Sequence, residues 1–69
     1  MNIVFTRHAR EQMNERKISE DDVINAIKFP KKTRKKGDTY YVKRQTISGE
    51  IEVVYVRENY IKVITVYPL

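Results

Sequence analysis

The chain contains a single histidine, His8, and this residue is the natural candidate for proton transfer. Imidazole accepts and releases protons near neutral pH, so His8 could act as a general acid or a general base. In metal-independent RNA cleavage a base removes the ribose 2′-hydroxyl proton, an acid protonates the leaving oxygen, and cations or hydroxyl groups stabilise the phosphate. The alternative is that His8 packs at the start of a helix and makes only local hydrogen bonds.

Four scattered basic residues, Arg16, Lys43, Arg44 and Arg57, are candidate phosphate ligands. Guanidinium groups bind phosphate with paired donors, and lysine supplies a point charge. Arg16 could instead stabilise the end of a helix, and Arg44 and Arg57 could be solvated at the rim of a sheet. Lys43 and Arg44 are neighbours in an expected strand, so they point to opposite faces and at most one of them serves a given pocket.

The densest charge lies in residues 31–36, which hold five cations in six residues, Lys31, Lys32 and Lys35 among them. If this segment is extended, its cations could follow a nucleic-acid backbone. Equally, it could be a solvated edge strand whose lysines block pairing with another sheet.

Thr65 and Tyr67 complete the candidate catalytic set with His8. In the expected register both share a sheet face with Lys43, and a hydroxyl group near a cation could orient a phosphate or assist proton transfer. The alternative is that they are ordinary strand residues with high β-propensity. We expect no metal and no cofactor, because the chain has one histidine, no cysteine and no glycine-rich phosphate loop.

Local signals predict two helices at the N-terminal end. Thr6 can cap a helix that runs from Arg7 to Arg16. A capping-box pattern beginning at Ser19 starts a second helix, which Pro30 ends. The short link between the helices predicts that they pack as a hairpin.

After Pro30 the pattern changes to period two, with β-branched and aromatic residues typical of strands. The expected strands are Lys31 to Lys36, Thr39 to Ile47, Glu50 to Arg57 and Tyr60 to Tyr67. Two-residue turns at Ser48-Gly49 and Glu58-Asn59 would place Val54 opposite Lys43 and Val63. The prediction is an α+β fold forming a single domain over residues 1–69, with two helices packed on one face of a three- to four-stranded antiparallel sheet.

The composition predicts a cytoplasmic protein that favours polyanions. Fourteen Lys and Arg against nine Asp and Glu give a net charge of +5 in 69 residues. No apolar stretch approaches the ~20 residues of a membrane span, and the N-terminus lacks a signal-peptide pattern. Because two helices can cover only one sheet face, the other face is expected to bind a ligand, a partner or a second copy in a homodimer.

A resemblance to a known family rests on both ends of the chain. The N-terminal part contributes Phe5, Thr6, His8, Ala9, Met13, Glu15, Arg16, Ile18, Ser19, Val23, Ala26, Ile27 and Pro30, and the C-terminal part contributes 53–55 and 64–67. Together they resemble domain-of-unknown-function family 4258, an uncharacterised prokaryotic group. Two departures are visible: Gln12 stands where members often have arginine, and Lys17 stands where glycine commonly ends the first helix.

The order of two helices followed by a sheet is also similar to RelE/ParE and BrnT toxins and to other metal-independent ribonucleases. This resemblance implies a RelE-like fold, cleavage of RNA and an antitoxin-like partner. The leading hypothesis is therefore a toxin-like metal-independent endoribonuclease or translation inhibitor. The alternative is a non-catalytic nucleic-acid- or protein-binding module, and the two differ in whether His8 lies beside Lys43, Thr65 or Tyr67 in an open cleft.

Overall fold

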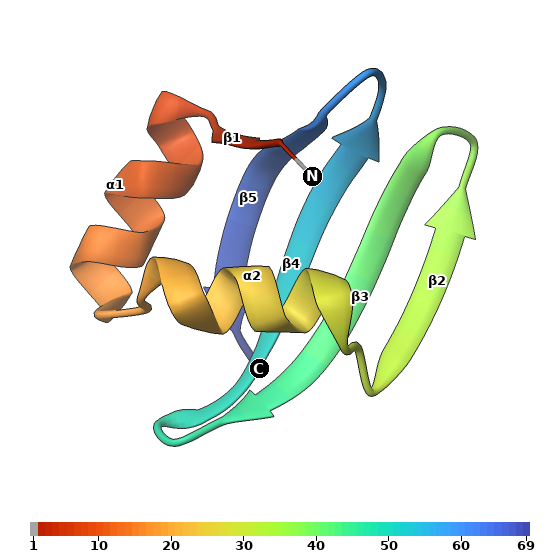
Figure 1. Cartoon of the computed structure of the whole chain (residues 1–69). Coiled ribbons are helices and arrows are strands. Elements are labelled where there is room, and N and C mark those ends of the chain that lie inside the picture. Colours follow the sequence, from red (N-terminus) through yellow and green to blue (C-terminus); the bar gives the residue numbers. More distant parts are fainter. Residues whose placement is uncertain (1) are drawn as a thin grey trace.

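The computed structural model describes residues 2–69 and shows an α+β fold (Figure 1). The elements follow in the order β1 (Ile3–Phe5), α1 (Arg7–Arg16), α2 (Glu20–Lys28), β2 (Lys32–Lys36), β3 (Thr39–Thr46), β4 (Gly49–Arg57) and β5 (Ile61–Pro68). None of the helices in this range is long and apolar enough to cross a membrane.

The sheet has five strands in the order β1-β5-β4-β3-β2 and is mixed. The predicted three- to four-stranded antiparallel sheet is therefore corrected in two ways. The strand β1, which was not predicted, adds a fifth strand, and it pairs parallel with β5, with Ile3 opposite Ile61. Only the pairs β2-β3, β3-β4 and β4-β5 are antiparallel.

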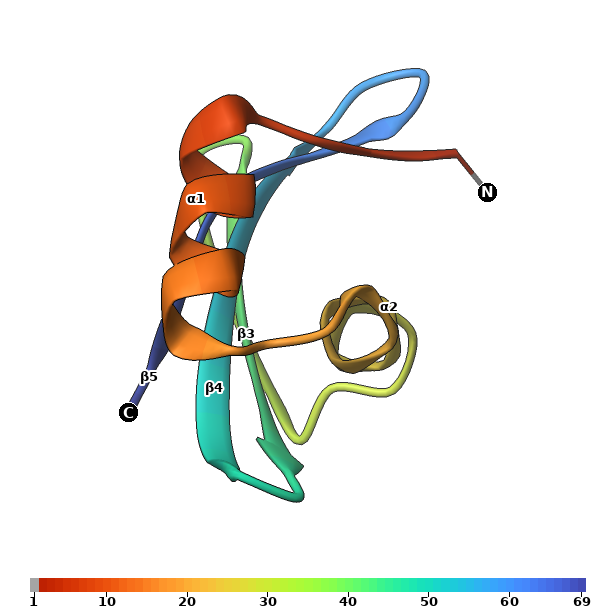
Figure 2. The same ribbon diagram turned by 90° about the vertical axis from the view of Figure 1, so that its left-hand side faces the viewer.

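The two helices take different positions relative to the sheet (Figures 1 and 2). Helix α2 crosses one face of the sheet over β3 and β4, whereas α1 lies alongside β5 at the edge of the sheet. They do not lie side by side as the predicted hairpin, because Ala9 and Met13 of α1 pack into the core beside β5. One sheet face is left without a helix.

Both predicted helix starts are confirmed. Thr6 Oγ1 accepts a hydrogen bond from the backbone N–H of Ala9, and Ser19 Oγ accepts one from Asp22. The end of α1 is formed by Lys17, whose φ of 56° and ψ of 44° are left-handed. A residue with a Cβ adopts this conformation at a cost, which is why glycine is favoured at such a position.

The register between β3 and β4 differs from the prediction by two residues. Thr46 pairs with Gly49, so Ile47 and Ser48 form the turn, and Lys43 lies opposite Glu52. The side chain of Thr46 stabilises this turn, since its hydroxyl donates to the carbonyl of Gly49 and accepts from the N–H of Ser48.

An irregularity in β4 and β5 changes which side chains reach the core. The register shifts between Val54 and Tyr55, so that Val54 pairs with Thr65 but Tyr55 pairs with Val63. A bulge of this kind turns the following side chains to the other face. Val63 and Ile61 therefore lie in the core, whereas the expected pairing of Val54 with Val63 would have placed them on the face of Val54.

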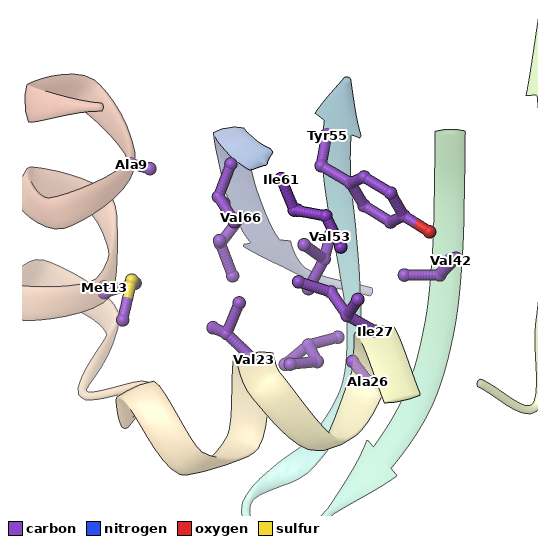
Figure 3. Packing of buried hydrophobic residues seen from close by; sticks show 12 residues of the cluster. Ala9, Met13, Val23, Ala26, Ile27, Val42, Val53, Tyr55, Ile61 and Val66 are labelled. Carbon is purple, nitrogen blue, oxygen red and sulfur yellow. The ribbon is translucent and has the colours of Figure 1, made fainter. Parts of the chain in front are cut away.

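The hydrophobic core fills the space between the sheet and the two helices (Figure 3). Val23, Ala26 and Ile27 of α2 pack against Val42 and Val53 of the central strands. These five residues are all buried. The core therefore fixes the outward direction of the alternate residues on β3 and β4, which carry the site described next.

Candidate functional site

The sheet face turned away from α2 carries four of the ten predicted site residues, Lys32, Lys43, Thr65 and Tyr67. Because Val42 and Val53 point into the core, their strand neighbours point to the opposite side. We call this side the open face, and its central part comprises Lys32, Arg34, Tyr41, Lys43, Glu52, Val54, Thr65 and Tyr67.

The strand register arranges these residues in two rows that cross four strands. The first row contains Lys32, Lys43, Glu52 and Tyr67, each directly opposite the next. The second row, one step along the strands, contains Arg34, Tyr41, Val54 and Thr65. Directly opposite residues have Cβ atoms only ~4.5–5.5 Å apart, so each row is a continuous line of neighbouring side chains.

A groove lies on the β2–β4 part of this face. It is lined by Lys32, Thr33, Arg34, Tyr41, Lys43 and Glu52. The Arg34 guanidinium lies 4.6 Å from the centroid of the Tyr41 ring. Three cations and one carboxylate line the groove, so its side chains carry a net positive charge that attracts phosphate.

Glu52 is the one buried charged residue within residues 2–69, with 6% of its surface exposed. The Tyr67 hydroxyl donates a 2.6 Å hydrogen bond to Glu52 Oε1. This hydrogen bond, followed by burial and by the negative charge of Glu52, raises the pKa of Tyr67. The ion pairs in this part of the chain join Arg10 to Glu20 and Lys31 to Glu50, so no cation lies within 4.0 Å of the Glu52 carboxylate.

Helix α1 borders the open face along β5. Gln12 Oε1 accepts hydrogen bonds from the Thr65 hydroxyl and, at 3.1 Å, from the backbone N–H of Val66. The opposite side of α1 faces α2, since Arg10 pairs with Glu20 at 2.7 Å. His8 precedes Gln12 by four residues, and residues at this spacing lie on the same side of a helix, ~5–6 Å apart.

His8 therefore stands on the side of α1 next to the open face, and its side chain is exposed. It is not among the residues that line the groove. Of the other predicted residues, four share the open face: Lys32, Lys43, Thr65 and Tyr67. The shared face of Lys43, Thr65 and Tyr67 was predicted from the alternation of side chains along the strands.

The remaining predicted cations lie elsewhere. Arg44 donates a 2.7 Å hydrogen bond to the carbonyl of Phe29 at the end of α2, and Lys35 lies over the Tyr40 ring at 5.1 Å. Both are on the helix side of the sheet. Lys31 Nζ lies 3.9 Å from Glu50 Oε2.

Arg16 and Arg57 are exposed at the ends of α1 and β4. Neither lines the groove. They are placed outside the two rows.

Two groove residues, Tyr41 and Glu52, were not predicted from the sequence, and Arg34 was predicted only as one of the five cations in residues 31–36. The available signal for Glu52 was its position between the apolar residues Ile51 and Val53 in an expected strand. Such a residue is expected to be solvated, and only the contact with Tyr67 across the strands reveals its burial. Within residues 2–69, no three His, Asp or Glu side chains are placed to hold a metal ion.

Comparisons with known proteins identify the chain at the level of the family. No curated protein and no solved structure gives a significant match. A family model, described as a domain of unknown function (DUF4258), matches residues 5–68. The match covers both helices, the groove residues and strand β5. The chain therefore belongs to the DUF4258 family.

Proposed function

We propose that this chain binds RNA across the open face and cleaves it without a metal ion, as a toxin-like endoribonuclease acting in the cytoplasm. The observation that carries the proposal is the groove, which Lys32, Arg34 and Lys43 line together with the buried residue Glu52. A set of cations beside a proton acceptor is what cleavage at a ribose phosphate needs.

The groove supplies contacts for both parts of a nucleotide. Lys32, Lys43 and Arg34 attract phosphate, and Tyr41 presents an aromatic ring on which a base or the Arg34 guanidinium can stack. The first row crosses four strands and so extends over about 14 Å, three strand spacings. An RNA strand lying along this row would run from the β2 edge toward α1.

The β5 side of the open face supplies the candidates for catalysis. Thr65 and Tyr67 carry hydroxyl groups there, and His8 stands on the adjoining side of α1. We assign His8 to proton transfer and the two hydroxyl groups to orienting the phosphate or the proton acceptor. The proposal includes an analogy between this fold and that of RelE/ParE and BrnT toxins, which rests on the order of the elements alone.

A toxin-like enzyme needs an inhibitor, and the open face is where we expect it to bind. An antitoxin-like protein with acidic side chains would complement the three groove cations and would block RNA. A second copy of this chain would bring like charges together, so the open face favours a heterologous partner over a homodimer.

A second candidate function is a non-catalytic RNA-binding module. It is favoured by one observation, that His8 does not line the groove. The cations of the open face would then hold RNA, and His8 would play no part in chemistry.

Cleavage and binding measured with two matched pairs of variants separate these functions. Cleavage of RNA in the presence of EDTA is compared for the wild type, His8→Ala and Glu11→Ala, an exposed control on α1. Binding is compared for Lys43→Ala and Lys28→Ala, which remove the same charge from the open face and from α2. Circular dichroism first checks that all variants are folded. The ribonuclease hypothesis then predicts loss of cleavage only in His8→Ala and weaker binding only in Lys43→Ala.

Each other outcome rejects part of the proposal. Binding that depends on Lys43 without any cleavage by the wild type would support the binding module. Equal RNA affinity of Lys43→Ala and Lys28→Ala would contradict binding at the open face.

A further inference from the structure

We propose that Glu52 is the general base that removes the 2′-hydroxyl proton of the RNA, an inference that rests on the function proposed above. The structural basis is the position of this buried residue, which lines the groove from β4, accepts a hydrogen bond from Tyr67 and lies opposite Lys43 in the first row.

The surroundings of Glu52 distinguish it from an ordinary structural carboxylate. A buried carboxylate without a cation partner destabilises a fold unless hydrogen bonds compensate. Within residues 2–69, the Tyr67 hydroxyl is its one hydrogen-bond donor, and no Lys or Arg nitrogen lies within 4.0 Å. The carboxylate is thus free of an ion pair that would have to break before it accepts a proton.

The order of residues in the first row indicates which part of an RNA would meet Glu52. The carboxylate repels phosphate, so phosphate oxygens belong over Lys32 and Lys43, on the β2–β3 side. The next position along the row is Glu52, one strand away. A ribose attached to a phosphate at Lys43 would therefore place its hydroxyl groups beside the carboxylate.

The reaction that follows is a transesterification. Glu52 takes the proton of the 2′-hydroxyl group, the 2′-oxygen forms a bond to phosphorus, and the bond between phosphorus and the 5′-oxygen breaks. The products are a 2′,3′-cyclic phosphate and a 5′-hydroxyl group. The leaving 5′-oxygen takes its proton from water, through which His8, which does not line the groove, would act as the general acid. Lys43 and Arg34 stabilise the phosphate charge.

Tyr67 is a positioning residue in this scheme. Its hydroxyl fixes the direction of the carboxylate through the 2.6 Å hydrogen bond. The hydrogen bond to Glu52 raises the pKa of Tyr67, so the phenol remains a donor to the carboxylate at neutral pH and into the alkaline range.

The test uses the whole chain and a DNA oligonucleotide that contains a single ribonucleotide, with the all-DNA oligonucleotide as a substrate lacking the 2′-hydroxyl group. Cleavage in EDTA is measured for the wild type, Glu52→Gln and Glu58→Gln. Glu58 lies exposed after β4, so both variants remove one negative charge. We expect Glu52→Gln to lower kcat by ~100-fold or more while oligonucleotide binding stays equal or becomes tighter, and Glu58→Gln to stay within about twofold. The product should carry a 2′,3′-cyclic phosphate.

The possible failures are distinguishable. Cleavage by Glu52→Gln at nearly the wild-type rate would overturn the role of Glu52 and leave the ribonuclease function standing. Absence of wild-type cleavage at the ribonucleotide would overturn both.

A second variant covers the case in which Glu52→Gln does not fold. Tyr67→Phe keeps the ring and removes only the hydroxyl group, and we expect kcat to fall about tenfold with KM within about twofold. A purely structural role would loosen the groove and raise KM instead. An unchanged kcat in this variant would count against the proposal.

Discussion

Tyr67 and Glu52 lie directly opposite each other on β5 and β4, and the Tyr67 hydroxyl donates a 2.6 Å hydrogen bond to Glu52 Oε1. The bond joins two central strands on the open face. It connects the stability of the sheet to the protonation of Tyr67, because deprotonation of the phenol removes the donor and places two negative charges side by side.

The first prediction concerns stability at alkaline pH. The pKa of Tyr67 is raised in the folded chain, so its contribution to stability is fully present below the unfolded value of about 10 and is lost as pH rises through the folded value. Urea unfolding at pH 8 and pH 11 should show a larger loss of free energy of unfolding for the wild type than for Tyr67→Phe. Burial also raises the pKa of Tyr55, so part of the loss remains in the variant. Equal losses in both proteins would contradict this prediction.

The second prediction concerns the end of α1. Lys17 adopts the left-handed conformation with a φ of 56°. Lys17→Gly removes the Cβ that this conformation disfavours and should raise the free energy of unfolding by about 0.5–1 kcal/mol. Lys17→Ala, which keeps the Cβ, is the control and should show no such gain. Urea denaturation at neutral pH measures both, and a loss of stability in Lys17→Gly would show that the side chain of Lys17 has a role that outweighs its backbone strain.

The third prediction concerns the attachment of α1 to β5. Gln12 Oε1 accepts hydrogen bonds from Thr65 and from the backbone of Val66, both partly buried. Gln12→Ala leaves these donors without a partner and should lower the free energy of unfolding by about 1–2 kcal/mol. Gln45→Ala, an exposed position on β3, should change it by less than about 0.5 kcal/mol. Similar values for the two variants would mean that Gln12 does not hold the helix in place.

The fourth prediction compares two lysines of one strand. Lys32 lines the groove on the open face, and Lys35 lies over the Tyr40 ring on the helix side. Lys32→Ala should weaken RNA binding and reduce the slope of log K against log salt by about 1. Lys35→Ala removes the same charge and should leave both quantities nearly unchanged. Fluorescence anisotropy titrations at several salt concentrations measure them, and identical slopes would indicate that strand β2 binds RNA without regard to its face.

The features predictable from the sequence are those set by local chemistry. Thr6 and Ser19 cap helices because their hydroxyl groups reach backbone donors three residues ahead, and Pro30 lies just beyond α2. The strand β1 has three residues and no local signal, since its partner is β5 at the far end of the chain. The side chain of Thr46 and the bulge after Val54 set the register, and neither follows from period-two alternation.

The candidate site also has one part that was predictable from the sequence and one part that depends on tertiary structure. Lys43, Thr65 and Tyr67 were predicted to share a face because alternation along each strand fixes it. The burial of Glu52 depends on its neighbours on adjacent strands, so its position between Ile51 and Val53 does not by itself predict it. The place of His8 depends on α1 lying at the edge of β5, which is a matter of tertiary packing.

The most direct test of the account is an NMR titration of the isotope-labelled chain with a short single-stranded RNA. Binding at the open face predicts that the largest chemical-shift changes fall on Lys32, Lys43, Glu52 and Tyr67, together with the Arg34 and Tyr41 signals. Changes confined to the helix side of the sheet, at Tyr40, Arg44 and Tyr55, or no changes at low salt, would contradict it.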